Sequence, residues 1–162
     1  MYYMALLHDV GKIGVDDAIL RKPSKLTDEE FAAIKAHTVI GSQILSRISS
    51  MPELQYGALY HHERWDGRGY PKGLKWEEIP EAARIIAVAD AYDAMTSNRS
   101  YRKALTQDCV HDEIVNGIGR QFWPPAARAM LKMMDQDIHY DMRQKNDESS
   151  QNDEQKYEYG IS

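Results

Sequence analysis

The chain has little cysteine and no apolar run long enough to cross a bilayer. Its single cysteine, Cys109, can form neither an internal disulfide nor a thiolate metal cluster, so any metal site must use other ligands. The longest apolar stretches, such as residues 85–89, fall far short of the roughly 20 residues that a membrane span needs. The first residues carry neither the basic region nor the cleavage pattern of a signal peptide. These absences predict a soluble cytoplasmic protein.

The chain also lacks an excess of positive charge. Lysine and arginine number 20 against 25 aspartates and glutamates, which gives a formal net charge of −5. General binding to a DNA backbone needs a broad basic surface, so the balance argues against a DNA partner. Basic residues can still cluster around a small anion. With 162 residues and 43% hydrophobic content, one domain with a real core is expected.

No segment alternates apolar and polar residues with period two, so the sequence predicts an all-α fold. Thr27 and Glu30 form a capping box at the start of a helix whose apolar stripe of threes and fours continues to Ile48. In this stripe Ile34, His37, Gly41, Ile44 and Ile48 share one face, which turns His37 inward. Further helices are expected after Pro52, over residues 81–95, from Thr106 to about Gly117, and over residues 124–134.

Composition divides the chain into a domain over residues 1–134 and a polar tail over residues 135–162. The tail is rich in Gln, Asn, Asp, Glu and Ser, which predicts mobility. Its tyrosines leave docking against the body as the alternative. Between residues 64 and 74 the turn formers of an Asp-Gly pair, Gly69 and a Pro-Lys-Gly run predict a loop.

Histidines and aspartates lie on faces that the periodicity turns inward. They are His8 and Asp9 after the first apolar run, His37, the doublet His61-His62, and Asp90. A lone histidine on an apolar face is more often a hydrogen-bonded core residue than a ligand. Asp90 is more telling, because a carboxylate buried in an apolar helix costs several kcal/mol unless it is paired or bound to metal. Arg84 is the alternative partner, at a spacing that is poor for contact.

Imidazole and carboxylate ligands without thiolate favour iron, manganese or zinc. An aspartate can bridge two such ions, which lower the pKa of a shared water and yield a hydroxide nucleophile for phosphoester hydrolysis. Lys12, Arg99 and Arg102 are candidates for holding the phosphate oxygens, although arginines near a helix end can simply complement its dipole. Asp93 is a candidate either to orient a ligand histidine, the favoured role, or to donate a proton to the leaving oxygen.

Taken in order, these motifs resemble the HD-GYP family, a branch of the HD phosphohydrolases. Residues 8–12 read as HDxGK, residues 37–41 as HxxxG and residues 61–71 as HHExxDGxGYP. The helix that carries Asp90 is followed by Arg-Ser-Tyr-Arg at residues 99–102, where the family has RPYR. The resemblance spans Met4 to about Leu131, and chance agreement with every motif in order is not credible.

The resemblance implies an all-helical metal-dependent phosphodiesterase of bacterial signalling, which converts cyclic di-GMP to linear pGpG and sometimes on to GMP. It implies two or three divalent ions on six ligands, with Asp9 bridging: His8, Asp9, His37, His61, His62 and Asp90. The implied phosphate-holding residues are Lys12, Arg99 and Arg102. The loop with Gly69, Tyr70 and Pro71 resembles one that shapes the substrate pocket and contacts cyclase domains. Its alternative is a rigid turn with an exposed tyrosine.

Two departures from the family pattern bear on activity. Family members carry helices before the His-Asp pair, one of which supplies a further histidine ligand, whereas this chain begins seven residues before His8. We therefore expect an N-terminally truncated domain that binds fewer ions, with exposed apolar surface that favours a homodimer. Trp123 stands where the family has an aspartate, and is expected to fill a gap or an interface. The alternatives are a non-catalytic cyclic-dinucleotide or partner-binding module, and a phosphohydrolase for another nucleotide.

Overall fold

The computed structural model describes residues 1–98 and 103–143, and these residues form helices. The only other regular feature among them is an isolated bridge between Ile118 and Phe122. The α-helices are α1 (Tyr2–Leu6), α2 (Asp17–Leu20), α3 (Asp28–Lys35), α4 (His37–Leu45), α5 (Leu54–Tyr60), α6 (Glu81–Thr96), α7 (Gln107–Gly117) and α8 (Pro124–Gln136). Two 3₁₀ helices, η1 (Val10–Gly14) and η2 (Trp76–Glu78), complete the set. The all-α expectation is confirmed.

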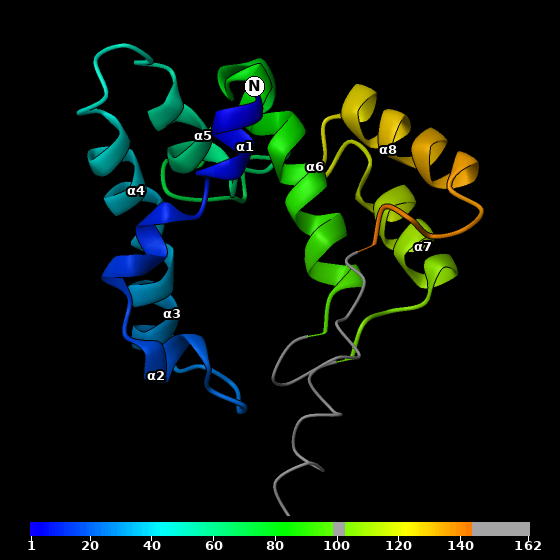
Figure 1. The fold of residues 1–162 in the computed structure, drawn as a ribbon, viewed down its shortest axis with the longest axis horizontal. Helices are drawn as coiled ribbons and strands as arrows, with labels where there is room; N and C mark the ends of the chain where they lie inside the picture. Colours follow the sequence, from blue (N-terminus) through cyan, green and yellow to red (C-terminus); the bar gives the residue numbers. More distant parts are fainter. Residues whose placement is uncertain (99–102, 144–162) are drawn as a thin grey trace, which may run out of the picture.

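Helix α6 runs through the middle of the molecule and separates two groups of helices, as Figure 1 shows. Helices α1 to α5 lie on one side, with α7 and α8 on the other. The apolar core on the first side consists of Met4, Leu45, Leu54, Ala58 and Ile86. The core on the second side consists of Val88, Tyr92, Val110, Ile114, Phe122, Ala127 and Met134. Since both sets include residues of α6, this one helix supplies apolar side chains to two cores.

The helix starts follow the local signals in the sequence. Thr27 accepts a hydrogen bond from the Glu30 amide, and Glu30 reaches back to the Thr27 amide, so the predicted capping box is present. Thr106 caps α7 by accepting from the amide of Cys109. Pro124 occupies the first turn of α8, where its missing N–H leaves no bond unmade. Side-chain oxygens and proline therefore fix these boundaries without help from tertiary contacts.

The apolar stripe between residues 28 and 48 is not one helix. The chain is interrupted at Ala36, where the hydroxyl of Thr38 donates to the carbonyl of Lys35 at 3.0 Å. The expectation that Ile44 and Ile48 are buried beside His37 is also wrong. His37 is 0% exposed, whereas Ile44 and Ile48 are 39% and 37% exposed. Leu45 takes the inward position instead.

Two glycines bring the segment that carries His8 and Asp9 against α4. A Cβ atom built at Gly11 would overlap the carbonyl oxygen of His37, and one at Gly41 would lie 3.2 Å from the Gly11 nitrogen. Only residues without side chains allow the two backbones to approach so closely. The glycines of the HDxGK and HxxxG patterns thus place Asp9 beside His37.

Beyond α8 the described chain continues to pack. The carboxylate of Asp137 accepts from the amides of Asp141 and Met142, and the guanidinium of Arg143 donates to the side-chain oxygen of Gln107. Met142 packs against the core shared by α6, α7 and α8. The division of the chain into a domain and a mobile tail after residue 134 stays a prediction, because residues 144–162 lie outside the described residues. Within the described part, no helix is both long and apolar enough to span a membrane.

Candidate metal centre

Six predicted ligand residues converge from four parts of the fold. His8 and Asp9 follow α1, His37 begins α4, and His61 and His62 follow α5. Asp90 lies in α6, with Oδ1 3.6 Å from Nε2 of His8. Its side chain is 22% exposed, so Asp90 is less deeply buried than the apolar sequence around it suggested. Residues that are up to 82 positions apart in the sequence therefore share one site.

Backbone carbonyls fix how three of the imidazoles present their nitrogens. Nδ1 of His8 lies 2.7 Å from the Ala5 carbonyl oxygen, and Nδ1 of His37 lies 2.6 Å from that of Ile34. Nδ1 of His61 lies 3.0 Å from the carbonyl oxygens of both Gly57 and Ala58. A carbonyl can only accept, so each Nδ1 carries the proton. In the neutral rings each Nε2 then has a free lone pair, which is the arrangement of metal-binding histidines.

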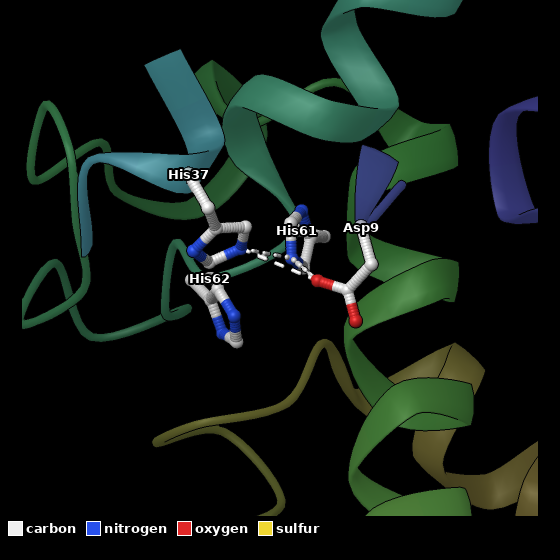
Figure 2. A group of neighbouring side chains, drawn as sticks. All are labelled: Asp9, His37, His61 and His62. Carbon is white, nitrogen blue, oxygen red and sulfur yellow. Dashed lines mark hydrogen bonds and ion pairs between the residues drawn. The ribbon is translucent and has the colours of Figure 1, made fainter. Parts of the chain in front are cut away.

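Figure 2 shows the Nε2 atoms of His37 and His61 turned toward each other and toward Asp9, with the His62 ring below His37. One possible ligand atom from each of these four residues lies within 4.8 Å of the others. His37 Nε2 and His61 Nε2 are 3.3 Å apart, and Asp9 Oδ1 lies 3.3 Å from the first and 3.8 Å from the second. Two neutral rings with lone pairs facing each other form no hydrogen bond. A shared cation between them would satisfy both.

The carboxylate of Asp9 belongs to two clusters of possible ligands. One cluster consists of Asp9, His37, His61 and His62, and the other consists of His8, Asp9 and Asp90. Oδ1 of Asp9 faces His37 and His61, while Oδ2 lies 3.4 Å from Nε2 of His8. Each oxygen thus serves a different cluster, which is the geometry of a bridging carboxylate between two ions.

The surroundings shift the pKa of His8 in the opposite direction from the pKa values of His61 and His62. Burial alone would lower the pKa of His8, but the carboxylates of Asp9 and Asp90 outweigh it and raise the pKa to about 10. Burial lowers the pKa of His61 to about 3, helped by the neighbouring His62 and His8, and lowers that of His62 to about 4. Burial also lowers the pKa of His37. His37, His61 and His62 are therefore neutral near pH 7 and available as ligands.

The two aspartates remain ionised. Burial favours their neutral forms, but hydrogen bonds and charge from His8 and Lys12 lower the pKa of Asp9. His8 and His62 act in the same direction on the pKa of Asp90. The site thus gathers two carboxylates and neutral imidazoles, the donor set that suits divalent first-row metals.

Two buried atoms in the site support its fit to metal ions. Within residues 1–98 and 103–143, Nε2 of His8 and Oδ1 of Asp9 are shielded from water, and their contacts of 3.3 to 3.8 Å with neighbouring site atoms are ion pairs rather than well-formed hydrogen bonds. Buried polar atoms are nearly always satisfied, so two such atoms in one cluster call for a partner that protein atoms do not supply. Both belong to the ligand clusters described above, and a divalent ion fits that role.

The other predicted site residues have different surroundings. Lys12 forms an ion pair with Oδ2 of Asp9 and reaches the edge of the site. Asp93 is exposed, and within the described chain its carboxylate accepts from Ser97 at 3.4 Å and from no histidine. Arg99 and Arg102 lie outside the described residues. The catalytic and phosphate-holding roles of these four residues stay predictions.

Arg84 does not pair with Asp90. Its guanidinium lies 4.5 Å from the ring centroid of Trp123 and 5.8 Å from that of Trp65. Trp123 thus fills space between the start of α8 and α6, as expected for a large aromatic in place of a carboxylate. With Arg84 turned away, the partner that Asp90 finds is His8.

Two hollows of about 610 and 890 Å³ meet at the ligand clusters. Both are lined by His62, Tyr70 and Asp90. The Tyr70 ring stacks on the His62 imidazole, with centroids 4.8 Å apart and planes at 27°. Tyr70 is partly buried, and burial raises the pKa of its hydroxyl, with Asp90 and Asp9 adding to the effect. This phenol therefore stays protonated beside the two carboxylates.

Sequence reasoning missed several residues at the site. Phe31 and Lys35 line the smaller hollow, and the Lys35 ammonium lies 4.8 Å from the Phe31 ring centroid. Lys35 stands two residues before His37, and this closeness in sequence was the available signal. Glu63 is 3% exposed; the HHExxDGxGYP motif contains it, but the sequence assigned it no role.

Comparison with known proteins places these motifs in a family. Residues 1–120 match the model of the HD domain. The chain is 47% identical over 153 residues to a cyclic di-GMP phosphodiesterase of Thermotoga maritima, which covers 93% of this chain and 41% of that protein. It is 47% identical over 131 residues to a cyclic di-GMP phosphodiesterase response regulator of Xanthomonas campestris, covering 79% of this chain and 34% of the relative.

A third relative is specific for a different cyclic dinucleotide. The chain is 40% identical over 134 residues to a 3′3′-cGAMP-specific phosphodiesterase of Vibrio cholerae, covering 82% of this chain and 26% of that protein. The chain thus spans less than half the length of each of these relatives. The similarity therefore concerns the one domain that this chain shares with each relative.

Proposed function

This chain belongs to the HD-domain family, in its HD-GYP branch, and from that premise we propose that it hydrolyses a phosphodiester bond of a cyclic dinucleotide at a centre of two divalent metal ions. One observation carries the proposal: two clusters of ligand atoms meet at Asp9, whose two oxygens face different clusters. Ions bound there supply Lewis-acid activation of a water molecule and of the phosphate.

The chain's own residues would hold and balance this chemistry. His37, His61 and His62 offer neutral rings, and Asp9 and Asp90 offer ionised carboxylates. Lys12 lies beside Asp9 and would neutralise charge on a phosphate oxygen. Asp93 and the arginines at 99 and 102 are assigned their proton-donating or orienting and phosphate-holding roles from the motifs alone. The donor set suits iron, manganese or zinc, in two or three copies.

Cyclic di-GMP is the proposed substrate, with linear pGpG and then GMP as products. Support comes from the relatives, because two that are 47% identical to this chain carry the name cyclic di-GMP phosphodiesterase. The 40% identical relative specific for 3′3′-cGAMP makes that mixed dinucleotide the second candidate. Both candidates present the same 3′–5′ phosphodiester to the metal centre, and they differ only in the base that the hollows receive.

We also propose two kinds of partner contact, one with a cyclase domain and one with a second copy of this chain. Gly69, Tyr70 and Pro71 form a loop at the rim of the site, which suits contact with a cyclase domain. Exposed apolar residues of α1, with Tyr2 72% and Leu6 63% exposed, favour a homodimer. The cytoplasmic location rests on the low cysteine content. A binding module without catalysis is the alternative function, and a phosphohydrolase for another nucleotide is a third.

Metal analysis and turnover test the proposal together. We expect the purified protein, reconstituted anaerobically with Fe²⁺ or Mn²⁺, to hold about two ions and to convert cyclic di-GMP to pGpG. His61→Ala and Asp90→Asn should each lower turnover by about 10²-fold or more, whereas the exposed His139→Ala should not. A folded protein that binds cyclic di-GMP and two ions but releases no product would favour the binding module. A folded protein without metal would overturn the proposal.

A further inference from the structure

Glu63 is a buried carboxylate that holds a loop by its backbone. Its side chain accepts hydrogen bonds from the amide of Lys72 at 2.7 Å, of Gly73 at 3.1 Å and of Leu74 at 3.0 Å. Glu63 is 3% exposed, and no cationic side chain among the described residues pairs with it. Burial of a carboxylate is unfavourable unless donors surround it. Three successive N–H groups of one loop therefore compensate this charge, in the manner of an anion-binding nest.

A second contact closes the same loop nearer its start. The Tyr70 amide donates to the carbonyl of His62 at 3.2 Å. Gly69 crosses so close to the backbone that a Cβ there would overlap the nitrogen of Arg64. The segment between Glu63 and Leu74 is thus tied back on itself on both sides of Tyr70. The position of the Tyr70 ring follows from these ties.

The ring held in this way touches the ligand cluster. Tyr70 stacks on His62, meets Phe31 edge-on with centroids 6.4 Å apart, and lines both hollows together with Asp90. A shift of the loop would move Tyr70 away from His62 and merge or reshape the two hollows. The side chain that fixes the loop thereby controls the walls of the site from a distance.

We propose that Glu63 is a positioning residue for substrate binding, which acts through Tyr70: its carboxylate sets the Tyr70 ring as a wall beside the metal ligands, against which a cyclic dinucleotide is held. This inference rests on the proposed function. Both carboxylate oxygens of Glu63 are taken up by the loop amides, so we expect it to act on the substrate through Tyr70. Its loss should therefore weaken binding of the dinucleotide far more than it slows the bond-breaking step.

A double-mutant cycle of Glu63→Gln and Tyr70→Ala separates this role from a merely structural one. Glutamine keeps the size of Glu63 but turns an NH₂ group toward a backbone N–H, so the loop loses an acceptor. Glu78→Gln is the matched control, because Glu78 also accepts from a backbone amide, that of Lys75, yet is exposed and lies away from Tyr70. The measurements are kcat and KM for cyclic di-GMP, metal content, and amide hydrogen exchange of residues 72–74.

We expect Glu63→Gln to raise KM by about tenfold or more, with kcat within about threefold of the parent and unchanged metal content. Exchange of the three loop amides should accelerate in Glu63→Gln and stay unchanged in Glu78→Gln. Tyr70→Ala should raise KM by a similar factor. The double variant should be no worse than Tyr70→Ala alone. Additive losses, or a fall in kcat with KM unchanged, would overturn the inference.

The outcomes also separate this inference from the proposed function. If the parent protein binds cyclic di-GMP but does not hydrolyse it, the proposed function fails. The double-mutant cycle is then measured as changes in Kd, and the inference stands if these changes are non-additive. If the parent is active and the cycle is additive, the inference fails alone. A parent that neither binds nor hydrolyses the dinucleotide overturns both. Should Glu63→Gln not fold, Glu63→Asp withdraws the same carboxylate from the loop and takes its place in the cycle.

Discussion

The two sides of α6 are stabilised in different ways. The α7–α8 side encloses a continuous apolar core in which Val110, Ile114 and Ala127 are 0% exposed. On the other side most of the buried polar residues of the described chain gather: His37, Thr38, Ser42, His61 and Glu63. Apolar burial stabilises a core without a specific ligand, whereas clustered imidazoles and carboxylates require their partners. The comparison predicts that bound metal stabilises the α1–α5 side and leaves the α7–α8 side unaffected.

The largest expected effect comes from removing the residue shared by both ligand clusters. Asp9→Ala should lower turnover by about 10³-fold or more and lower the metal content to less than one ion per chain, because each cluster loses an oxygen. Asp108→Ala, an exposed aspartate in the first turn of α7, is the control and should keep both. Elemental analysis and a turnover assay check this. Retention of two ions in Asp9→Ala would show that the clusters do not share it.

The opposite side should respond in stability alone. Ile114→Ala removes a fully buried side chain, so it should lower the free energy of unfolding by about 3 kcal/mol. The metal content per folded molecule should stay at the parent value. Urea unfolding of metal-loaded protein, followed by metal analysis of the folded fraction, measures both. A variant that folds but has lost half its metal would break the comparison.

Proton release should accompany metal binding on the α1–α5 side. The metal-free protein keeps His8 protonated at pH 7, since its pKa is raised to about 10, while His61 and His62 are neutral with pKa values of about 3 and 4. Binding must therefore expel a proton from His8, and the apparent affinity should rise about tenfold per pH unit from pH 7 toward 10. Calorimetry in buffers of different ionisation enthalpy counts the proton. No released proton at pH 7.5 would contradict the assignment of His8 as a ligand.

The same pKa values set the pH dependence of the metal-free fold. A raised pKa means that His8 contributes stability fully below about pH 6.5 and loses it as the pH rises through about 10. His61 and His62 act oppositely, because they charge more readily when unfolded. Their lowered pKa values make the fold less stable as the pH falls from about 6.5 toward 3 and 4.

The smallest effect is expected where the two sides are joined. Arg84→Met should keep the length of the side chain and lose the cation–π contact with Trp123, which lowers the free energy of unfolding by about 1 kcal/mol or less. Metal content and turnover should not change, because Arg84 does not pair with Asp90. Thermal unfolding and metal analysis test this. Loss of metal in Arg84→Met would instead support the alternative that Arg84 pairs with Asp90.

Local signals account for most of what the sequence predicted of the fold. Thr27 and Thr106 mark helix starts because their side chains accept hydrogen bonds from nearby backbone amides. Pro124 does so because it lacks an N–H in a first turn that needs none, so no distant partner is involved. The interruption at Ala36 escaped prediction because an unbroken apolar stripe hid it. The exposure of Ile44 and Ile48 also escaped prediction, because spacing alone does not show which apolar residues another element covers.

The site was predictable in its members and not in its surroundings. Histidine and aspartate on inward faces of apolar segments are unfavourable without a shared partner, so their grouping could be foreseen. Which partner each side chain selects depends on distant chain segments. Arg84 stacks on Trp123, and Glu63 bonds to a loop nine to eleven residues away, and neither contact leaves a periodic trace in the sequence.

Helix α6 explains why a single carboxylate was so informative. Because it packs against two cores, its charged residues are few: besides Asp90 it carries Glu81, Arg84 and Asp93. Of the acids in α6, Asp90 is the one that directly follows the apolar run of residues 85–89, where a carboxylate is costly without a partner. A helix that packs against two cores admits few polar residues. A carboxylate beside its apolar run therefore points to a functional site.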